Sequence, residues 1–90
     1  MSSMRFMQSR DVAWNYLGDH IVAFTLSGEK EFHDLNSTAA SIFQALESPK
    51  SENELVAALV AEFDISPDSA VIDVRSVLAS MKEKKLITAE

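Results

Sequence analysis

The sequence predicts an α+β domain in which a three-stranded antiparallel β-meander precedes three α-helices, in the order βββααα. Two observations predict this class. Apolar residues alternate over residues 12–17 and run almost without interruption over residues 20–26, as they do in strands. After residue 36 they recur every third or fourth position, as on helices, and turn or capping residues mark each change of period.

The predicted strands cover residues 12–17, 20–26 and 30–34. In the first, alternation puts Val12, Trp14 and Tyr16 on one face. Gly18-Asp19 predicts a two-residue hairpin because glycine accepts positive φ, and residues 27–29 predict the next turn. Strands joined by hairpins lie side by side in chain order, so the second strand is central and the short, charged third strand is an edge.

Each predicted helix begins at a polar capping residue: Asn36, Ser51 and Ser66. Pro49 ends the first helix near Glu47 or Ser48. Glu54 completes a capping box at the second start. Pro67 suits the first position of the third helix, whose apolar pattern runs to about Lys84. The three helices are expected to cover one face of the sheet, which describes a winged-helix-like fold.

Length and composition predict one domain over residues 1–90, with residues 1–11 as a flexible, polar lead-in that shows no period. There is no cysteine, no apolar run long enough to span a membrane and no visible signal peptide, so we expect a cytoplasmic protein. The net charge of −6 disfavours nucleic acid as a partner and suits a neutral or basic one, or simple solubility.

Residues with catalytic potential are few. His20 and His33 lie on different predicted strands and lack the spacing of metal ligands. Gly18 and Gly28 are isolated turn residues, so no phosphate-binding loop is predicted, and no glycine-flanked nucleophile is present. We therefore expect neither an enzyme nor a bound metal or cofactor.

A set of residues spread from about Val12 to Ile87 carries a family resemblance. It comprises Trp14, Phe32, Leu35-Asn36, Ala39-Ala40, Ile42, Glu54-Leu55-Val56, Leu59, Glu62-Phe63-Asp64, Asp73-Val74, Val77-Leu78, Met81 and Leu86-Ile87. In this order and spacing the chain resembles the PqqD-like proteins, the RiPP recognition elements of ribosomal peptide modification. One position departs from the family pattern, since Lys85 stands where glycine usually precedes the closing Leu-Ile.

The resemblance implies a function in peptide recognition. Proteins of this kind bind the leader of a precursor peptide and present it to a modifying enzyme, such as a radical SAM enzyme, a protease or a cyclase. The leader adds as an antiparallel strand to the edge of the third strand, in the groove beside the third helix. Backbone hydrogen bonds then supply affinity and side-chain pockets supply selectivity.

The candidate peptide-binding residues follow from these two elements: Lys30, Glu31, Phe32, His33 and Asp34 on the strand, and Ala70, Asp73, Val74, Val77 and Met81 on the helix. The strand residues offer their backbone groups. The side chain of Phe32 is expected to pack in the core, and that of Trp14 against the sheet. The charges of the strand also suit a second role, which is to prevent aggregation at a free edge.

Two other functions are compatible with this outline. A winged-helix DNA-binding regulator would share it, but Pro67–Asp73 at the start of the third helix is acidic and apolar, with Arg75 the only nearby base. An adaptor could bind a protein partner through Ile72 and Ala79, which lie off the apolar stripe.

Overall fold

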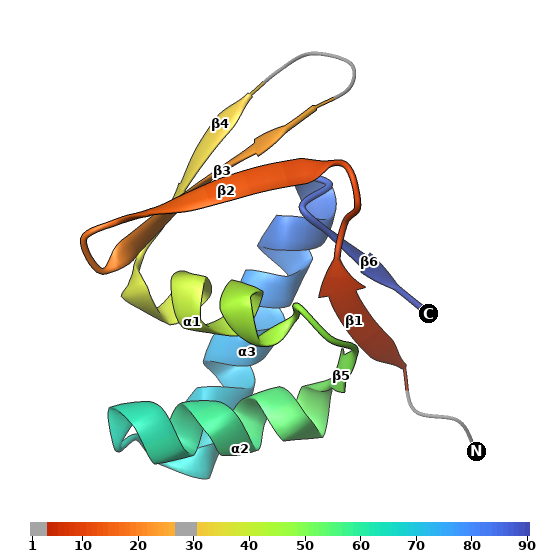
Figure 1. Cartoon of the computed structure of the whole chain (residues 1–90). Coiled ribbons are helices and arrows are strands. Elements are labelled where there is room, and N and C mark those ends of the chain that lie inside the picture. The colour runs from red at the N-terminus through yellow and green to blue at the C-terminus, as the bar shows by residue number, and fades with distance from the viewer. Residues whose placement is uncertain (1–3, 27–30) are drawn as a thin grey trace.

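The computed structural model describes residues 4–26 and 31–90. The elements are β1 (Arg5–Gln8), β2 (Val12–Leu17), β3 (His20–Thr25), β4 (Phe32–Leu35), α1 (Ser37–Ala45), β5 (Lys50–Ser51), α2 (Glu52–Phe63), α3 (Pro67–Glu83) and β6 (Ile87–Ala89). In the described part of the chain they form three helices and two three-stranded antiparallel sheets, as Figure 1 shows. The α+β class is confirmed.

The predicted meander is confirmed as the sheet β2-β3-β4, with β3 in the centre. The β2–β3 pair has no break in register between Val12 opposite Thr25 and Leu17 opposite His20. Gly18 has a φ of +68° in the two-residue hairpin, a conformation that glycine adopts without steric cost. The third strand begins later than expected, and the predicted turn at residues 27–29 lies outside the described residues.

The helix starts agree with the prediction, because each expected cap accepts a backbone N–H of the first turn: Asn36, Ser51 and Ser66. At α2 both bonds of the capping box are present. The backbone N–H of Ser51 donates to the Glu54 carboxylate over 2.9 Å, and this bond holds the pKa of Glu54 below its ordinary value. Helix α1 ends at Ala45, slightly earlier than expected.

The second sheet, in the order β5-β1-β6, was not predicted. It corrects the expectation that residues 1–11 form a flexible lead-in, because Arg5–Gln8 is a strand and Phe6 is buried. Phe6 lies opposite Lys50 on one side and Ala89 on the other, so both partners of β1 come from far along the chain. A four-residue strand with such distant partners leaves no local period to detect.

The end of α3 explains the departure at Lys85. The N–H of Lys85 bonds the carbonyl of Lys82 over 3.0 Å, and the N–H of Leu86 bonds the carbonyl of Met81 over 2.9 Å. This pair of bonds is a Schellman cap, in which the residue after the helix takes a left-handed conformation. Lys85 has a φ of 63°, so the helix keeps the cap that favours glycine without having the glycine.

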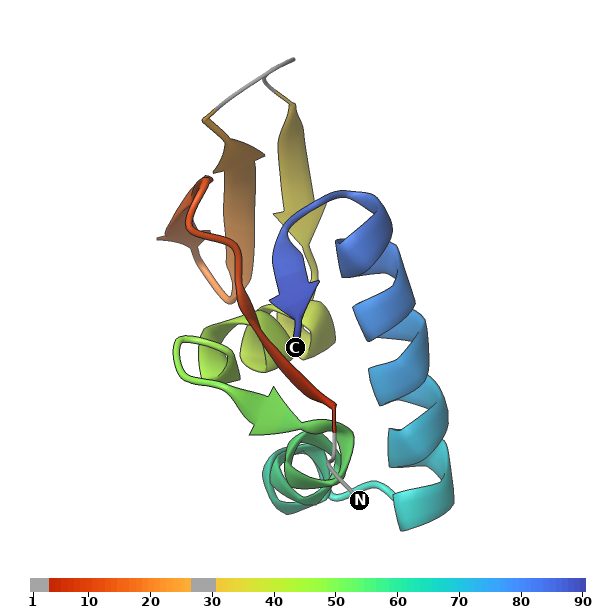
Figure 2. The same ribbon diagram turned by 90° about the vertical axis from the view of Figure 1, so that its right-hand side faces the viewer.

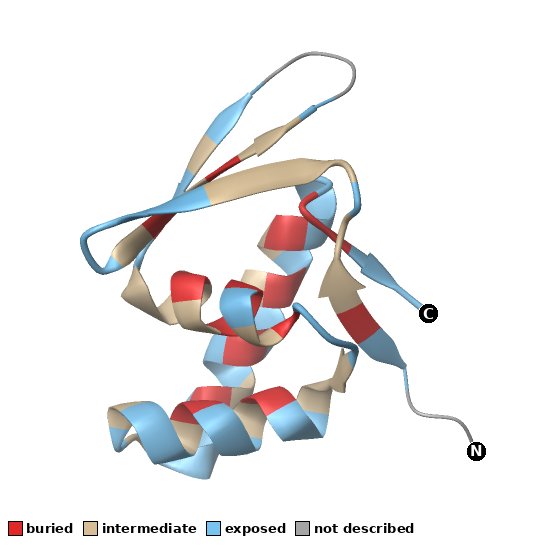
Figure 3. Ribbon diagram, in the orientation of Figure 1, coloured by how far each residue is buried: buried red, intermediate tan, exposed pale blue. Residues whose placement is uncertain are grey.

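One hydrophobic cluster joins the sheets and the helices. Helix α1 lies against β3 and β4, and α2 packs along α3. Figure 3 shows buried residues on the inward faces of the helices and within β1 and β3. No helix in the described residues has the length and apolar character needed to cross a membrane.

Candidate functional site

The open edge of β4 is the first component of the site. The meander has two outer strands, β2 and β4, and β4 pairs with β3. Figure 2 shows that β4 is the strand of the meander nearest to α3. An unpaired strand edge presents rows of N–H and C=O groups that can bind another extended chain.

The β2–β3 pair establishes which way the backbone groups of β3 point. Leu26 donates its N–H to the carbonyl of Asp11 over 2.9 Å, across this pair. Successive residues of an antiparallel strand direct their backbone groups to opposite sides. With no break in register, Ile21 and Ala23 therefore direct theirs toward β4.

The same alternation assigns the residues of β4. Leu35 and His33 lie opposite Ile21 and Ala23, so their backbone groups are used in the ladder with β3. Phe32, together with Asp34, then directs its N–H and C=O to the free edge. The edge available to a partner chain is thus formed by the backbone of two identified residues.

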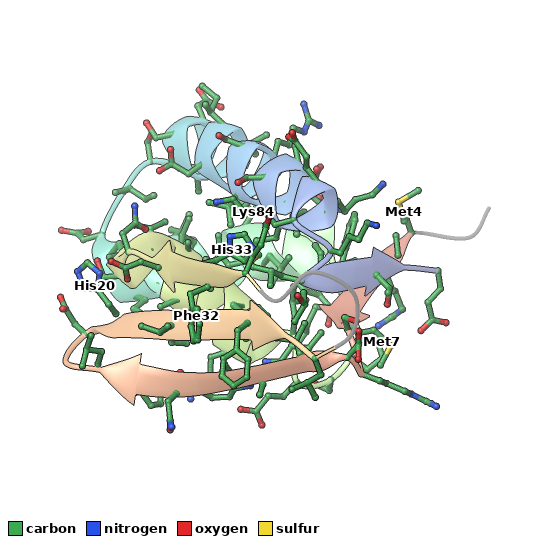
Figure 4. The ribbon with its side chains drawn as sticks, turned by 90° about the horizontal axis from the view of Figure 1, so that it is seen from above. Met4, Met7, His20, Phe32, His33 and Lys84 are labelled. Carbon is green, nitrogen blue, oxygen red and sulfur yellow. The ribbon has the colours of Figure 1, made fainter. Side chains whose placement is uncertain are left out.

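The side chains of β4 alternate between two faces of the sheet. Leu35 is buried and His33 is largely buried on the face that packs against the helices. Phe32 and Asp34 occupy the opposite, outer face. Phe32 is 72% exposed, so the expectation that its side chain packs in the core is wrong. Figure 4 looks down on the sheet and shows Phe32 on it, with His33 on the side toward α3.

A cleft of about 220 Å³ lies between β4 and α3 and is the second component of the site. Its lining comprises Asp34, Leu35, Asn36, Ala39, Ser76, Val77, Ser80, Met81 and Lys84. Leu35 and Met81 are buried and form an apolar floor, to which the half-buried Val77 adds. Ser76, Ser80 and Lys84 supply a polar rim. Such a mixture can hold an apolar side chain and bond the backbone around it.

His33 is a polar residue of β4 that is largely buried on the inner face of the sheet. Its side chain is 12% exposed, and its Nε2 atom is buried without a hydrogen-bond partner among the described residues. The nearest carboxylate oxygen is Oε2 of Glu31, at 3.6 Å. A buried polar atom of this kind is costly unless it finds a partner, and the Glu31 carboxylate is close enough to supply one after a small movement.

The structure places only some of the predicted site residues at the cleft. Val77 and Met81 line the cleft with Asp34, whereas Asp73 is exposed outside it. Ala70 and Val74 are fully buried and do not line the cleft, so their assignment to the peptide-binding face is corrected: both pack in the core. Lys30 lies outside the described residues.

Sequence reasoning also missed part of the cleft. Ser76, Ser80 and Ala39 line it but were not proposed, because the candidates on α3 followed its apolar stripe and Asp73, and none was taken from α1. Helical spacing holds the missing signal: Ser76 and Ser80 are four residues apart and so share one face of α3. Among the described residues, no cluster of three or more His, Asp or Glu side chains is placed to hold a metal ion.

Comparisons with known proteins agree with this geometry. The profile of the family described as Coenzyme PQQ synthesis protein D (PqqD) matches residues 23–87, more than two thirds of the chain. A solved structure titled "TbiB1 in Complex with the TbiA(beta) Leader Peptide" is similar, with a TM-score of 0.81 and 25% sequence identity over 90% of this chain and 93% of that one. A search of curated proteins found no match. The family match establishes that the chain belongs to the PqqD family.

Proposed function

We propose that this protein is a non-catalytic binding module that recognises the leader of a ribosomally synthesised precursor peptide. The leader adds as an antiparallel strand to β4, beside α3, and the module presents the precursor to a modifying enzyme of RiPP or pyrroloquinoline quinone-type biosynthesis. Membership of the PqqD family supports this function, as does the structural similarity to a chain solved with a leader peptide.

The observation that carries the proposal is the coincidence of a free edge with a cleft. Phe32 and Asp34 direct backbone groups to the edge of β4, and the cleft opens between the same strand and α3. A strand added there gains main-chain hydrogen bonds, which are independent of sequence. Its alternate side chains enter the cleft, which makes the binding selective.

The polar character of the cleft suits recognition of a flexible chain. Ser76, Ser80 and Lys84 can bond backbone or side-chain groups of the leader, while Val77 and Met81 contact its apolar residues. Ordering a flexible leader costs conformational entropy, so the module is expected to bind reversibly and release its cargo after modification.

The described surface of α3 disfavours the alternative of DNA binding. The first half of α3 carries Asp68 and Asp73 on its exposed surface. These carboxylates would repel the phosphates that a recognition helix must approach.

Titration of the isotope-labelled protein with the leader of the short peptide encoded beside its gene tests the proposal. Backbone amide shifts concentrated in residues 31–36 and 76–84 are the expected result. The absence of shifts with that peptide, together with clear shifts on adding duplex DNA at moderate salt, would overturn it.

A further inference from the structure

We propose that the outer face of β4 reads the leader at two positions, through Phe32 and Asp34. Phe32 selects an aromatic or large apolar residue of the leader, and Asp34 selects a lysine or arginine two residues earlier in the leader. This inference rests on the proposed function, because it requires the leader to lie along β4.

The backbone geometry brings these two side chains next to the leader. Phe32 and Asp34 are the residues whose N–H and C=O groups point to the free edge, so each forms a hydrogen-bonded pair with one leader residue. Their Cα atoms then lie about 5.5 Å from those of their leader partners. Since paired residues point their side chains to the same face, both contacts occur on the outer face, and Asp34 also contributes to the lining of the cleft at the edge of β4.

An apolar row already crosses this outer face and ends at Phe32. Ala13, Phe24 and Phe32 lie opposite one another across the three strands. The rings of Phe24 and Phe32 are 5.3 Å apart between centroids, yet Phe32 is 72% exposed because, among the described residues, no strand covers its other side. An apolar leader residue in the next position of the row would cover that side and extend the ring contact.

Asp34 ends the neighbouring row, after Asn15 and Val22. Its side chain is 69% exposed and has a histidine neighbour on the sheet side, with the Nδ1 atom of His20 at 3.2 Å from Oδ1. The leader side of the carboxylate is open to a cation. A lysine or arginine in the next position of this row would face Asp34 directly, and the net charge of −6 would favour its approach.

The order of the two leader residues follows from strand direction. The meander is antiparallel throughout, and antiparallel pairing is the more stable arrangement per residue. A leader that runs against β4 meets Asp34 before Phe32. The predicted signature is therefore Lys or Arg, then any residue, then an aromatic or large apolar residue. The intervening residue faces the inner side, opposite His33.

Leader scanning combined with protein variants tests the proposal. Synthetic copies of the leader of the peptide encoded beside the gene carry serine, lysine or glutamate at each position in turn, and calorimetry gives each Kd. We expect two sensitive outward positions, two residues apart, in the predicted order. Phe32→Ser and Asp34→Asn should each weaken binding about two- to fivefold.

A charge exchange makes the assignment specific. Asp34→Lys should bind the natural leader at least about fivefold more weakly and should regain affinity for the leader in which the basic residue is glutamate. Leu17→Ser is the matched control, because Leu17 is 68% exposed on the far strand of the same outer face. It should leave the Kd unchanged.

Three results would overturn the proposal. If the leader shifts amides along β4 and α3 but Phe32→Ser and Asp34→Lys bind it normally, the two-position reading fails while the proposed function stands. If Phe32→Ser leaves the affinity for the leader unchanged but abolishes self-association or binding to the modifying enzyme, the outer face binds a second copy of the chain or the enzyme instead of the leader. If the wild-type protein binds no leader, both the reading and the proposed function fail.

Discussion

Replacing Lys85 with glycine should stabilise the fold, although it removes a side chain. Lys85 follows α3 in the left-handed conformation, with a φ of 63°, where a β-carbon crowds the backbone. The two hydrogen bonds of the cap, from Lys85 to Lys82 and from Leu86 to Met81, hold it in that conformation. The side chain is exposed, so its removal costs little packing.

The magnitude follows from two opposing terms. A residue with a β-carbon in the left-handed region costs about 1–2 kcal/mol, which glycine avoids. Glycine in turn adds about 0.5–1 kcal/mol of backbone entropy to the unfolded chain. The net gain lies between about 0 and 1.5 kcal/mol, and its midpoint of about 0.75 kcal/mol corresponds, for a domain of this size, to a rise in Tm of about 3–6 °C.

Thermal unfolding followed by circular dichroism measures this change. Lys84→Gly is the matched control, because it removes the same charge one residue earlier, where φ is −81° and glycine brings no relief. Its Tm should fall, by the equivalent of about 0.5–1 kcal/mol. A Tm for Lys85→Gly equal to or below that of the wild type would refute the strain argument for this cap.

Three further substitutions test the site and a helix cap. Asp34→Pro removes a backbone N–H from the free edge of β4, so calorimetry should show leader binding about 1 kcal/mol weaker than that of Asp34→Asn. His33→Pro is the control: it removes an N–H that bonds β3, so it should lower the Tm. Val77→Asp should weaken leader binding by about 1–3 kcal/mol and keep the native circular dichroism spectrum, because Val77 lines the cleft. Ile72→Asp is the control, since Ile72 is exposed outside the cleft. If Val77→Asp unfolds the protein, Val77 belongs to the core. Because the pKa of Glu54 is lowered in the fold, its carboxylate stabilises the protein above the ordinary value of 4.5, and this contribution is lost as the pH falls through the lower folded value. Glu54→Gln should therefore show a smaller drop in the urea midpoint between pH 7 and about pH 3 than the wild type, and an equal drop would contradict the assignment.

The parts of the fold that the sequence predicts well are those with local signals. The caps at Asn36, Ser51 and Ser66 and the hairpin at Gly18 depend on residues close together in the chain. Strand β1 depends on partners more than forty residues away, at Lys50–Ser51 and Ile87–Ala89. Its four residues carry no period of their own, so only the folded chain reveals it.

The candidate site divides in a similar way. Sequence spacing places Val77 and Met81 on one stripe of α3, and both line the cleft. The same spacing could not separate them from Val74, because one apolar stripe of α3 supplies residues both to the core and to the cleft. Which residues of the stripe line the cleft depends on where β4 lies against the helix. The prediction for Phe32 failed for a different reason: alternation along a strand assigns residues to two faces but does not show which face is buried.

An edge that binds peptides must also avoid pairing with its own copies, and the one acidic residue of β4, Asp34, could meet both demands. Two copies of β4 that met edge to edge in antiparallel fashion would bring their Asp34 carboxylates onto the same outer face, where like charges near one another destabilise a strand pair. A leader with a cation at that position would relieve the repulsion instead of adding to it. The charge that would keep copies of the protein from pairing at this edge is thus the one that would favour a basic leader strand. Replacing Asp34 by a neutral residue should therefore loosen selectivity and promote self-association together.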